Sequence, residues 1–253
     1  MGKLLTAQEL AEILSLSVDT IWRYTRQEKI PVVELGEKQY RYEKEAVLAA
    51  LVSLGTLSVK EKHAEYSKQN GYTYEDYLKI PEEPGYRFVV LEGHLVKEPS
   101  PSVHHQRVSR ELAYQLKAFF DDFDPEGELF FAPLDVTLTN SNVLQPDILF
   151  VSGVRSGIIQ KNRIDGSCDL VIEIMSPTNR RMDRLHKMEI YRQAEIPHYW
   201  IVDPEENTIE AFRLVNGNYS LIIGVGLGDR FHHPEFSDLD LNLDKIFYRP
   251  ESE

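Results

Sequence analysis

Two short runs of apolar, β-branched residues near the middle of the chain each carry one carboxylate. Residues 146–151 contain Asp147, and residues 169–174 contain Glu173. Runs so rich in Val and Ile predict strands that are buried on both faces. A carboxylate in such a strand must be protonated, paired or bound to a metal, because burying it bare costs several kcal/mol. We therefore expect Asp147 and Glu173 to lie on neighbouring strands and to bind a hard divalent cation through oxygen ligands.

Each carboxylate also has a purely structural interpretation. Asp147 follows Pro146 and could be a turn residue that opens a strand. Glu173 could form a buried salt bridge with Arg180 or Arg181. Two carboxylates on adjacent buried strands favour the metal interpretation over two separate structural ones.

The elements that must position these carboxylates follow from the hydrophobic periodicity of the later part of the chain. Strands are expected at residues 88–91, 94–96, 128–131, 135–138, 146–152, 169–175, 199–202, 208–214 and 219–223. Helices are expected at residues 102–120 and 183–195. This order predicts an α/β sandwich in which a mixed sheet is flanked by helices.

The first fifty residues predict a small, mostly helical domain. Thr6 caps a helix at residues 7–14, and Glu9 completes a capping box. Ser17 caps a second helix at residues 18–27 after a very short turn, which is the spacing of a helix-turn-helix unit. A small β-wing is expected at residues 32–35 and 38–42, and a closing helix at residues 43–54.

Charge and composition divide the chain near residue 53. The formal net charge is -13, but residues 1–60 contain eight Lys/Arg and eight Asp/Glu and are neutral. Polar residues replace the apolar periodicity after that point, so we expect a helix-turn-helix domain at 1–53, a linker at 54–71 and a second domain at 72–253. The acidic balance argues against a protein that coats nucleic acid by bulk electrostatics, but it is compatible with a local basic groove.

Other features of the sequence exclude several classes of protein. No apolar run is long enough to span a bilayer and no signal peptide is recognisable, so we expect a cytoplasmic protein with no membrane partner. Cys168 is the only cysteine, which excludes an internal disulfide framework and a Cys-based zinc site.

The N-terminal pattern resembles the small excisionase-like and MerR-like winged helix-turn-helix domains. The resemblance runs through Leu5-Thr6, Ala11, Leu14, Ser17, Thr20-Ile21, Lys29-Ile30-Pro31 and Ala46. It implies that the second helix enters the major groove of DNA while the wing touches the backbone. The side chains that it places on DNA are Thr20, Arg23 and Arg26 on the helix, with Lys38 and Arg41 on the wing. The alternative is a module that binds protein, and the neutral charge of residues 1–60 favours this alternative.

The second domain resembles the Uma-type restriction endonucleases of the PD-(D/E)XK nuclease superfamily. Three segments carry the resemblance: Ser100-Pro101-Ser102 with His105-Gln106-Arg107, the tract 169–178, and the tract from Arg181 to Asp203-Pro204. It implies a restriction-endonuclease-like fold and hydrolysis of DNA phosphodiester bonds with Mg²⁺, or Mn²⁺, held by Asp147 and Glu173. It also implies that His105 faces the site, although a lone helical His is as often a capping or core residue.

The chain departs from the superfamily motif at one position. The motif has a lysine two residues after the glutamate, where this chain has Met175. By the resemblance, Lys187 on the following helix takes that place and orients the attacking water or stabilises the transition state. Asp183, Lys187 and Tyr191 are spaced to share one helical stripe. The alternative is that Asp183 and Lys187 form a surface ion pair of little energetic value.

Three functions from different classes remain open at this point. The first is a metal-dependent DNA endonuclease that is targeted by its helix-turn-helix domain. The second is a DNA-binding regulator whose nuclease-like domain is inactive and serves dimerisation. The third is a nuclease that acts on RNA or single strands. The expected partners are DNA and, in a homodimer, a second copy of the chain.

Overall fold

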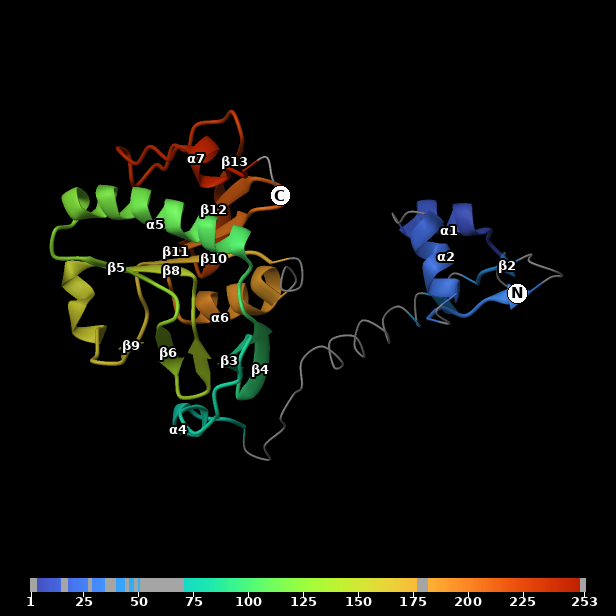
Figure 1. Ribbon diagram of the computed structural model, residues 1–253, viewed down its shortest axis with the longest axis horizontal. Coiled ribbons are helices and arrows are strands. Elements are labelled where there is room, and N and C mark those ends of the chain that lie inside the picture. Colours follow the sequence, from blue (N-terminus) through green and yellow to red (C-terminus); the bar gives the residue numbers. More distant parts are fainter. Residues whose placement is uncertain are drawn as a thin grey trace. The chain divides into compact units, whose positions relative to one another are not determined.

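The chain divides into two compact units, Met1–Ala64 and Glu65–Glu253. The computed structural model describes residues 4–14, 18–26, 29–34, 40–43, 46, 47, 50, 71–176 and 182–250, and Figure 1 traces the elements in chain order. Nearly all of the predicted linker, residues 54–71, lies outside the described residues.

The first unit contains the predicted helix pair and wing. Its helices are α1 (Ala7–Leu14) and α2 (Val18–Arg26), and its strands β1 (Val33–Glu34) and β2 (Tyr40–Arg41) pair antiparallel. The predicted capping box is confirmed, because the Glu9 amide donates to Thr6 Oγ1 and the Thr6 amide donates to Glu9 Oε2. Leu10, Ile21 and Tyr42 are fully buried between these elements. The predicted turns at 15–17 and 36–37, and most of the closing helix, lie outside the described residues.

The second unit is built on a six-stranded mixed sheet with the strand order β13-β12-β11-β10-β8-β5. Its strands are β5 (Glu128–Phe131), β8 (Ile148–Val151), β10 (Leu170–Ile174), β11 (His198–Asp203), β12 (Thr208–Val215) and β13 (Asn218–Gly226). β10 runs parallel to β11 and antiparallel to β8. Every residue of β8 and β10 is buried, which confirms that both faces of the two central strands are covered.

A second sheet of five strands, in the order β4-β3-β7-β6-β9, packs against the first. Its strands are β3 (Tyr86–Leu91), β4 (His94–Pro99), β6 (Asp135–Thr139), β7 (Asn142–Leu144) and β9 (Arg163–Asp165). The sequence predicted one mixed sheet, whereas the strands divide between two. Periodicity locates strands but does not assign partners, and the β6-β7 hairpin pairs with β3 instead of joining the main sheet.

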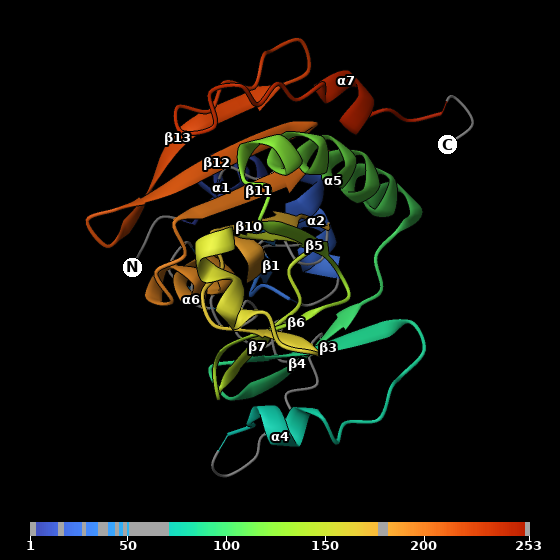
Figure 2. The same ribbon diagram turned by 90° about the vertical axis from the view of Figure 1, so that its left-hand side faces the viewer.

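Helices and the second sheet cover the two faces of the six-stranded sheet. α5 (Val103–Phe123) lies across one face with the C-terminal segment, including α7 (Leu243–Ile246), as Figures 1 and 2 show. The opposite face packs against α6 (Met188–Gln193) and the five-stranded sheet. Two short helices, α4 (Tyr74–Tyr77) and the 3₁₀ turn η1 (Gly153–Ile158), complete the unit. This layering confirms the predicted α/β class.

Among the described residues, no helix is both long enough and apolar enough to cross a membrane.

Candidate active site

Asp147 and Glu173 lie on adjacent strands, as the sequence predicted. Asp147 immediately precedes β8, Glu173 belongs to β10, and Ile148 pairs with Ile172 in the ladder between them. Both carboxylates are buried, with 2% and 1% of their surfaces exposed. Asp147 Oδ2 accepts a hydrogen bond of 2.8 Å from the backbone amide of Ile174, which ties the first carboxylate to the strand of the second.

His105 faces this pair from the first turn of α5. Ser102 is the N-cap of the helix, and its side chain accepts from the His105 amide and so fixes the start of the helix. The ring Nε2 lies 3.2 Å from Asp147 Oδ2 and 3.0 Å from the carbonyl oxygen of Ile174. Because both neighbours are hydrogen-bond acceptors, the tautomer that fits carries its proton on Nε2. His105 therefore occupies the position to which the family resemblance assigned it.

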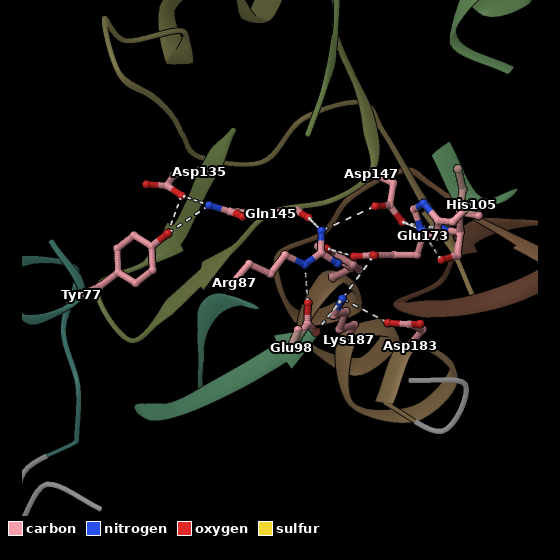
Figure 3. Close-up of polar contacts among 12 residues, drawn as sticks. Tyr77, Arg87, Glu98, His105, Asp135, Gln145, Asp147, Glu173, Asp183 and Lys187 are labelled. Atoms are coloured by element: carbon pink, nitrogen blue, oxygen red, sulfur yellow. Dashed lines mark hydrogen bonds and ion pairs between the residues drawn. The ribbon is translucent and has the colours of Figure 1, made fainter. Parts of the chain in front are cut away.

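Lys187 reaches the site from a π-helical turn, η2 (Met182–Lys187). Figure 3 shows its side chain beside Glu98, Glu173 and Asp183. Its Nζ lies 3.1 Å from Asp183 Oδ1, 3.2 Å from Glu173 Oε2 and 3.2 Å from Glu98 Oε1. The lysine is 1% exposed and Asp183 2% exposed, so the alternative of a surface ion pair is wrong. π-Helical turns are rare and often occur at functional sites, because the wider winding redirects a side chain.

Glu173 has both of its oxygens engaged. Oε2 accepts from Lys187, and Oε1 accepts a hydrogen bond of 2.6 Å from the Tyr191 hydroxyl. The three residues of the predicted helical stripe are thus all buried around the candidate site. Arg180 and Arg181, the alternative partners of Glu173, lie outside the described residues.

Two further charged residues enter the site from the second sheet and were missed in the sequence. Arg87 and Glu98 are opposite each other in the β3-β4 ladder, and Arg87 Nε lies 2.8 Å from Glu98 Oε2. Arg87 Nη1 also lies 3.6 Å from Asp147 Oδ1, so the arginine links the hairpin to the main sheet. The sequence held one indication that Glu98 is buried, because Glu98 follows Val96 at the two-residue spacing of a buried strand face. It was not used, because the strand was predicted to end at residue 96.

The buried cluster carries an excess of negative charge. Its four carboxylates, on Glu98, Asp147, Glu173 and Asp183, face two cations, Arg87 and Lys187, which leaves a formal charge of 2 − 4 = −2. Burial raises the pKa of Glu173 to about 8; Lys187 opposes this shift, and the charges of Asp183 and Asp147 add to it. Burial also raises the pKa of Asp147, but the hydrogen bond from His105 and the nearby charges outweigh burial, so the pKa of Asp147 is lowered. The environment of Glu173 therefore favours its neutral form, and a bound cation would favour the ionised form.

A pocket of about 200 Å³ opens onto this cluster. Its walls include Arg87, His105, Glu173, Ile174 and Asp183. A phosphate group that entered it would meet the imidazole of His105 and the guanidinium of Arg87, and between them the carboxylates. Such a mixture of charges requires a further cation before a polyanion can approach closely.

The donor set fits a hard divalent cation. Carboxylate oxygens of Asp147 and Glu173 and the carbonyl of Ile174 are the ligand types that Mg²⁺ prefers, and a charge of +2 would balance the cluster. Among the described residues, no three His, Cys, Asp or Glu side chains form a ready-made metal cage. That arrangement is ordinary for Mg²⁺, which is commonly held by one or two carboxylates and retains several waters.

The residues predicted to contact DNA lie in the first unit. Arg26 is exposed at the end of α2, and Arg41 is partly buried, with its Nη1 donating to the Tyr40 carbonyl. Thr20 and Arg23 lie on α2, but their side chains are not among the described groups. Lys38 lies outside the described residues altogether.

Comparison with known proteins identifies both units. The model of the Uma2 family, described as "Putative restriction endonuclease", matches residues 74–244. The chain belongs to this family. A second model, described as "Helix-turn-helix domain", matches residues 4–51 and confirms the predicted N-terminal domain.

A solved structure has a similar fold. It is the crystal structure of a "putative nuclease belonging to DUF820" from Anabaena variabilis, with a TM-score of 0.56 and 20% sequence identity. The match covers 69% of this chain and 97% of that one. A search of curated proteins finds no match. The Uma2 family and the nuclease-type fold are therefore shown.

Proposed function

We propose that the chain is a metal-dependent endonuclease that hydrolyses phosphodiester bonds of DNA. The observation that carries this proposal is the pair of buried carboxylates, Asp147 and Glu173, on adjacent strands of a cluster with two negative charges in excess. A structural salt-bridge network has no need of that excess, whereas a Mg²⁺ or Mn²⁺ site does. Membership of the Uma2 family supports the same reaction class.

The residues of the chain would divide the work of hydrolysis as follows. Asp147 and Glu173 would hold the cation, which when bound lowers the pKa of a coordinated water and withdraws charge from the phosphate. Burial lowers the pKa of Lys187, but the three carboxylates around the ammonium outweigh burial and raise this pKa well above the ordinary value. Lys187 therefore keeps its proton. It would orient the attacking water and oppose the negative charge that develops on the phosphate. His105 holds Asp147 in position through Nε2, and Arg87 would attract the phosphate into the pocket.

The proposal predicts cleavage that depends on a divalent metal. The full-length chain, at micromolar concentration, is expected to cut DNA in Mg²⁺ or Mn²⁺ and to leave it intact in EDTA. Products are resolved on denaturing gels, with duplex DNA, single-stranded DNA and RNA tested side by side. A protein that is inert on all three with either metal would support the alternative of a regulator with an inactive nuclease-like domain.

We further propose that the first unit targets the enzyme by placing α2 in the major groove of DNA. Arg26, exposed at the end of that helix, is the described residue that best tests this. Arg26→Glu is expected to weaken duplex binding about tenfold or more and to lower the slope of log affinity against log salt by about 1 to 2. Binding is measured by fluorescence anisotropy in EDTA, with the exposed Lys161→Glu as the matched charge reversal. Equal affinities for the two variants would favour the protein-binding alternative.

A further inference from the structure

A groove of about 900 Å³ runs between the outer side of α5 and the edge strand β5. It is much larger than the pocket over the carboxylates, and its lining residues lie outside the carboxylate cluster. Its lining residues include Arg107, Arg110, Tyr114, Lys117, Phe131 and Ala132.

The groove and the pocket over the carboxylates are lined by neighbouring residues of the same chain segments. On the α5 side, Val103 and Gln106 line the groove, while the intervening His105 lines the catalytic pocket. On the β5 side, the Ala132 amide donates a hydrogen bond of 3.0 Å to the carbonyl of Asp147. Both walls of the groove are therefore formed by segments that lie directly beside His105 and Asp147, so a polymer bound there would lie next to the candidate site.

The surface chemistry of the groove combines exposed aromatic rings with positive charge. Tyr114 is 73% exposed and Phe131 63% exposed. Arg107, Arg110 and Lys117 face a single acid among the lining residues, Asp121, so the groove has a formal charge of 3 − 1 = +2 in a chain of net charge -13. The pair Lys117–Asp121 is solvent-exposed at 2.6 Å, and such pairs are weak enough for a phosphate to compete for the lysine.

We propose that this groove binds a single-stranded segment of the nucleic-acid substrate and guides it to Asp147 and Glu173. Bases stack on exposed aromatic rings only when they are not paired, and cationic side chains neutralise the phosphates between them. The inference rests on the proposed nuclease function and specifies its substrate as nucleic acid with an unpaired segment. Because β5 is an edge strand, a second copy of the chain is the competing occupant, as the predicted homodimer would require.

The test compares single-stranded and duplex binding by variants of the groove. Fluorescence anisotropy is recorded on the full-length chain in EDTA, with a labelled twenty-nucleotide strand and with its duplex. The double variant Tyr114→Ala/Phe131→Ala is expected to lose about tenfold or more in affinity for the single strand, since it removes two stacking surfaces. Arg110→Glu is expected to lose about as much. Duplex affinity is expected to change less than about twofold, because the first unit carries it.

The controls are exposed residues of the same type away from the groove. Tyr248→Ala removes a tyrosine ring that is 65% exposed, and Lys161→Glu reverses an exposed charge. Both are expected to keep the wild-type affinity for the single strand. Circular dichroism confirms folding, which is expected because every substituted side chain is exposed.

The outcomes separate this inference from the proposed function. If the groove variants keep the wild-type affinity for the single strand, the assignment of the groove as a single-strand binding site is wrong, even if the chain cleaves DNA. Weaker single-strand binding by the groove variants would support the groove even if the wild type cuts nothing with metal. Sedimentation velocity tests whether a second copy of the chain occupies the groove. If the wild type is a dimer, the double variant is a monomer and the affinity for the single strand is unchanged, the groove is a contact between copies and the proposal is overturned.

Discussion

Glu173→Gln is expected to abolish metal-dependent cleavage while making the metal-free protein more stable at pH 8. The amide keeps the shape of the carboxylate: its oxygen can accept from Lys187 Nζ while its nitrogen donates to the Tyr191 hydroxyl, but it removes a charged metal ligand. We expect a loss of about a thousandfold or more in turnover, which corresponds to about 4 kcal/mol of transition-state stabilisation. Gel-based cleavage rates with Mg²⁺ and Mn²⁺ measure this effect.

The gain in stability follows from the raised pKa of Glu173. Its pKa rises from an ordinary 4.5 to about 8 on folding, so the folded chain binds more protons than the unfolded chain between these values. The contribution of Glu173 to the unfolding free energy is complete below pH 4.5 and is lost as the pH rises through about 8, by about 5 kcal/mol as an upper bound. The amide of the Glu173→Gln variant does not titrate, so the variant escapes this loss.

Differential scanning calorimetry in EDTA at pH 5 and pH 8 measures the stability effect. The difference in unfolding temperature between the variant and the wild type is expected to grow in favour of the variant from pH 5 to pH 8. The control is Asp169→Asn, which removes a carboxylate that is paired with Arg155 at the other end of the same strand. It is expected to retain cleavage. A Glu173→Gln variant that still cleaves DNA at the wild-type rate would remove Glu173 from the reaction.

Lys187→Met is expected to impair both stability and turnover. The substitution leaves Glu98, Glu173 and Asp183 buried around a methyl-thioether, and removing one partner of a buried ion pair costs about 3 to 5 kcal/mol. Turnover is expected to fall by a factor of about 10² to 10³, the range typical of removing one preorganised electrostatic group. Urea unfolding and single-turnover cleavage are the measurements.

A compensated variant separates the two roles of Lys187. Adding Glu98→Gln and Asp183→Asn to Lys187→Met removes two of the buried charges that the lysine balances, so much of the stability is expected to return. Turnover is expected to stay low, because nothing replaces the cation beside Glu173. Recovery of wild-type turnover together with stability would show that Lys187 acts only as a counter-ion in the folded protein.

The central pair of the site could be predicted because its signal is local. Two β-branched strands, each with one acid, are visible in a short stretch of sequence, and burial of the acids follows from the character of the strands. The stripe of Asp183, Lys187 and Tyr191 was visible for the same reason, since i, i+4 spacing depends only on helical winding. That the first turn is π-helical was not predictable, because an α-helix satisfies the same spacing.

The remaining charges of the cluster could not be predicted because they depend on tertiary packing. Arg87 and Glu98 belong to a hairpin of the second sheet, and nothing in its sequence shows that this hairpin packs beside Asp147. They add one positive and one negative charge, so they leave the formal excess of the cluster unchanged but supply contacts of Lys187 and Asp147 that the sequence did not reveal. The groove beside α5 was missed for a similar reason, since Tyr114 and Phe131 line one groove only because the helix lies beside the edge strand.

The position of a bound cation tests the account most directly. Crystals of the full-length chain soaked in Mn²⁺ would give an anomalous signal at each metal site. We expect a peak between Asp147 and Glu173, about 2.1 Å from their nearest oxygens, with Lys187 Nζ still in contact with Glu173. A map with no peak at this cluster under saturating Mn²⁺, or a peak held only by Glu98 and Asp183, would contradict it.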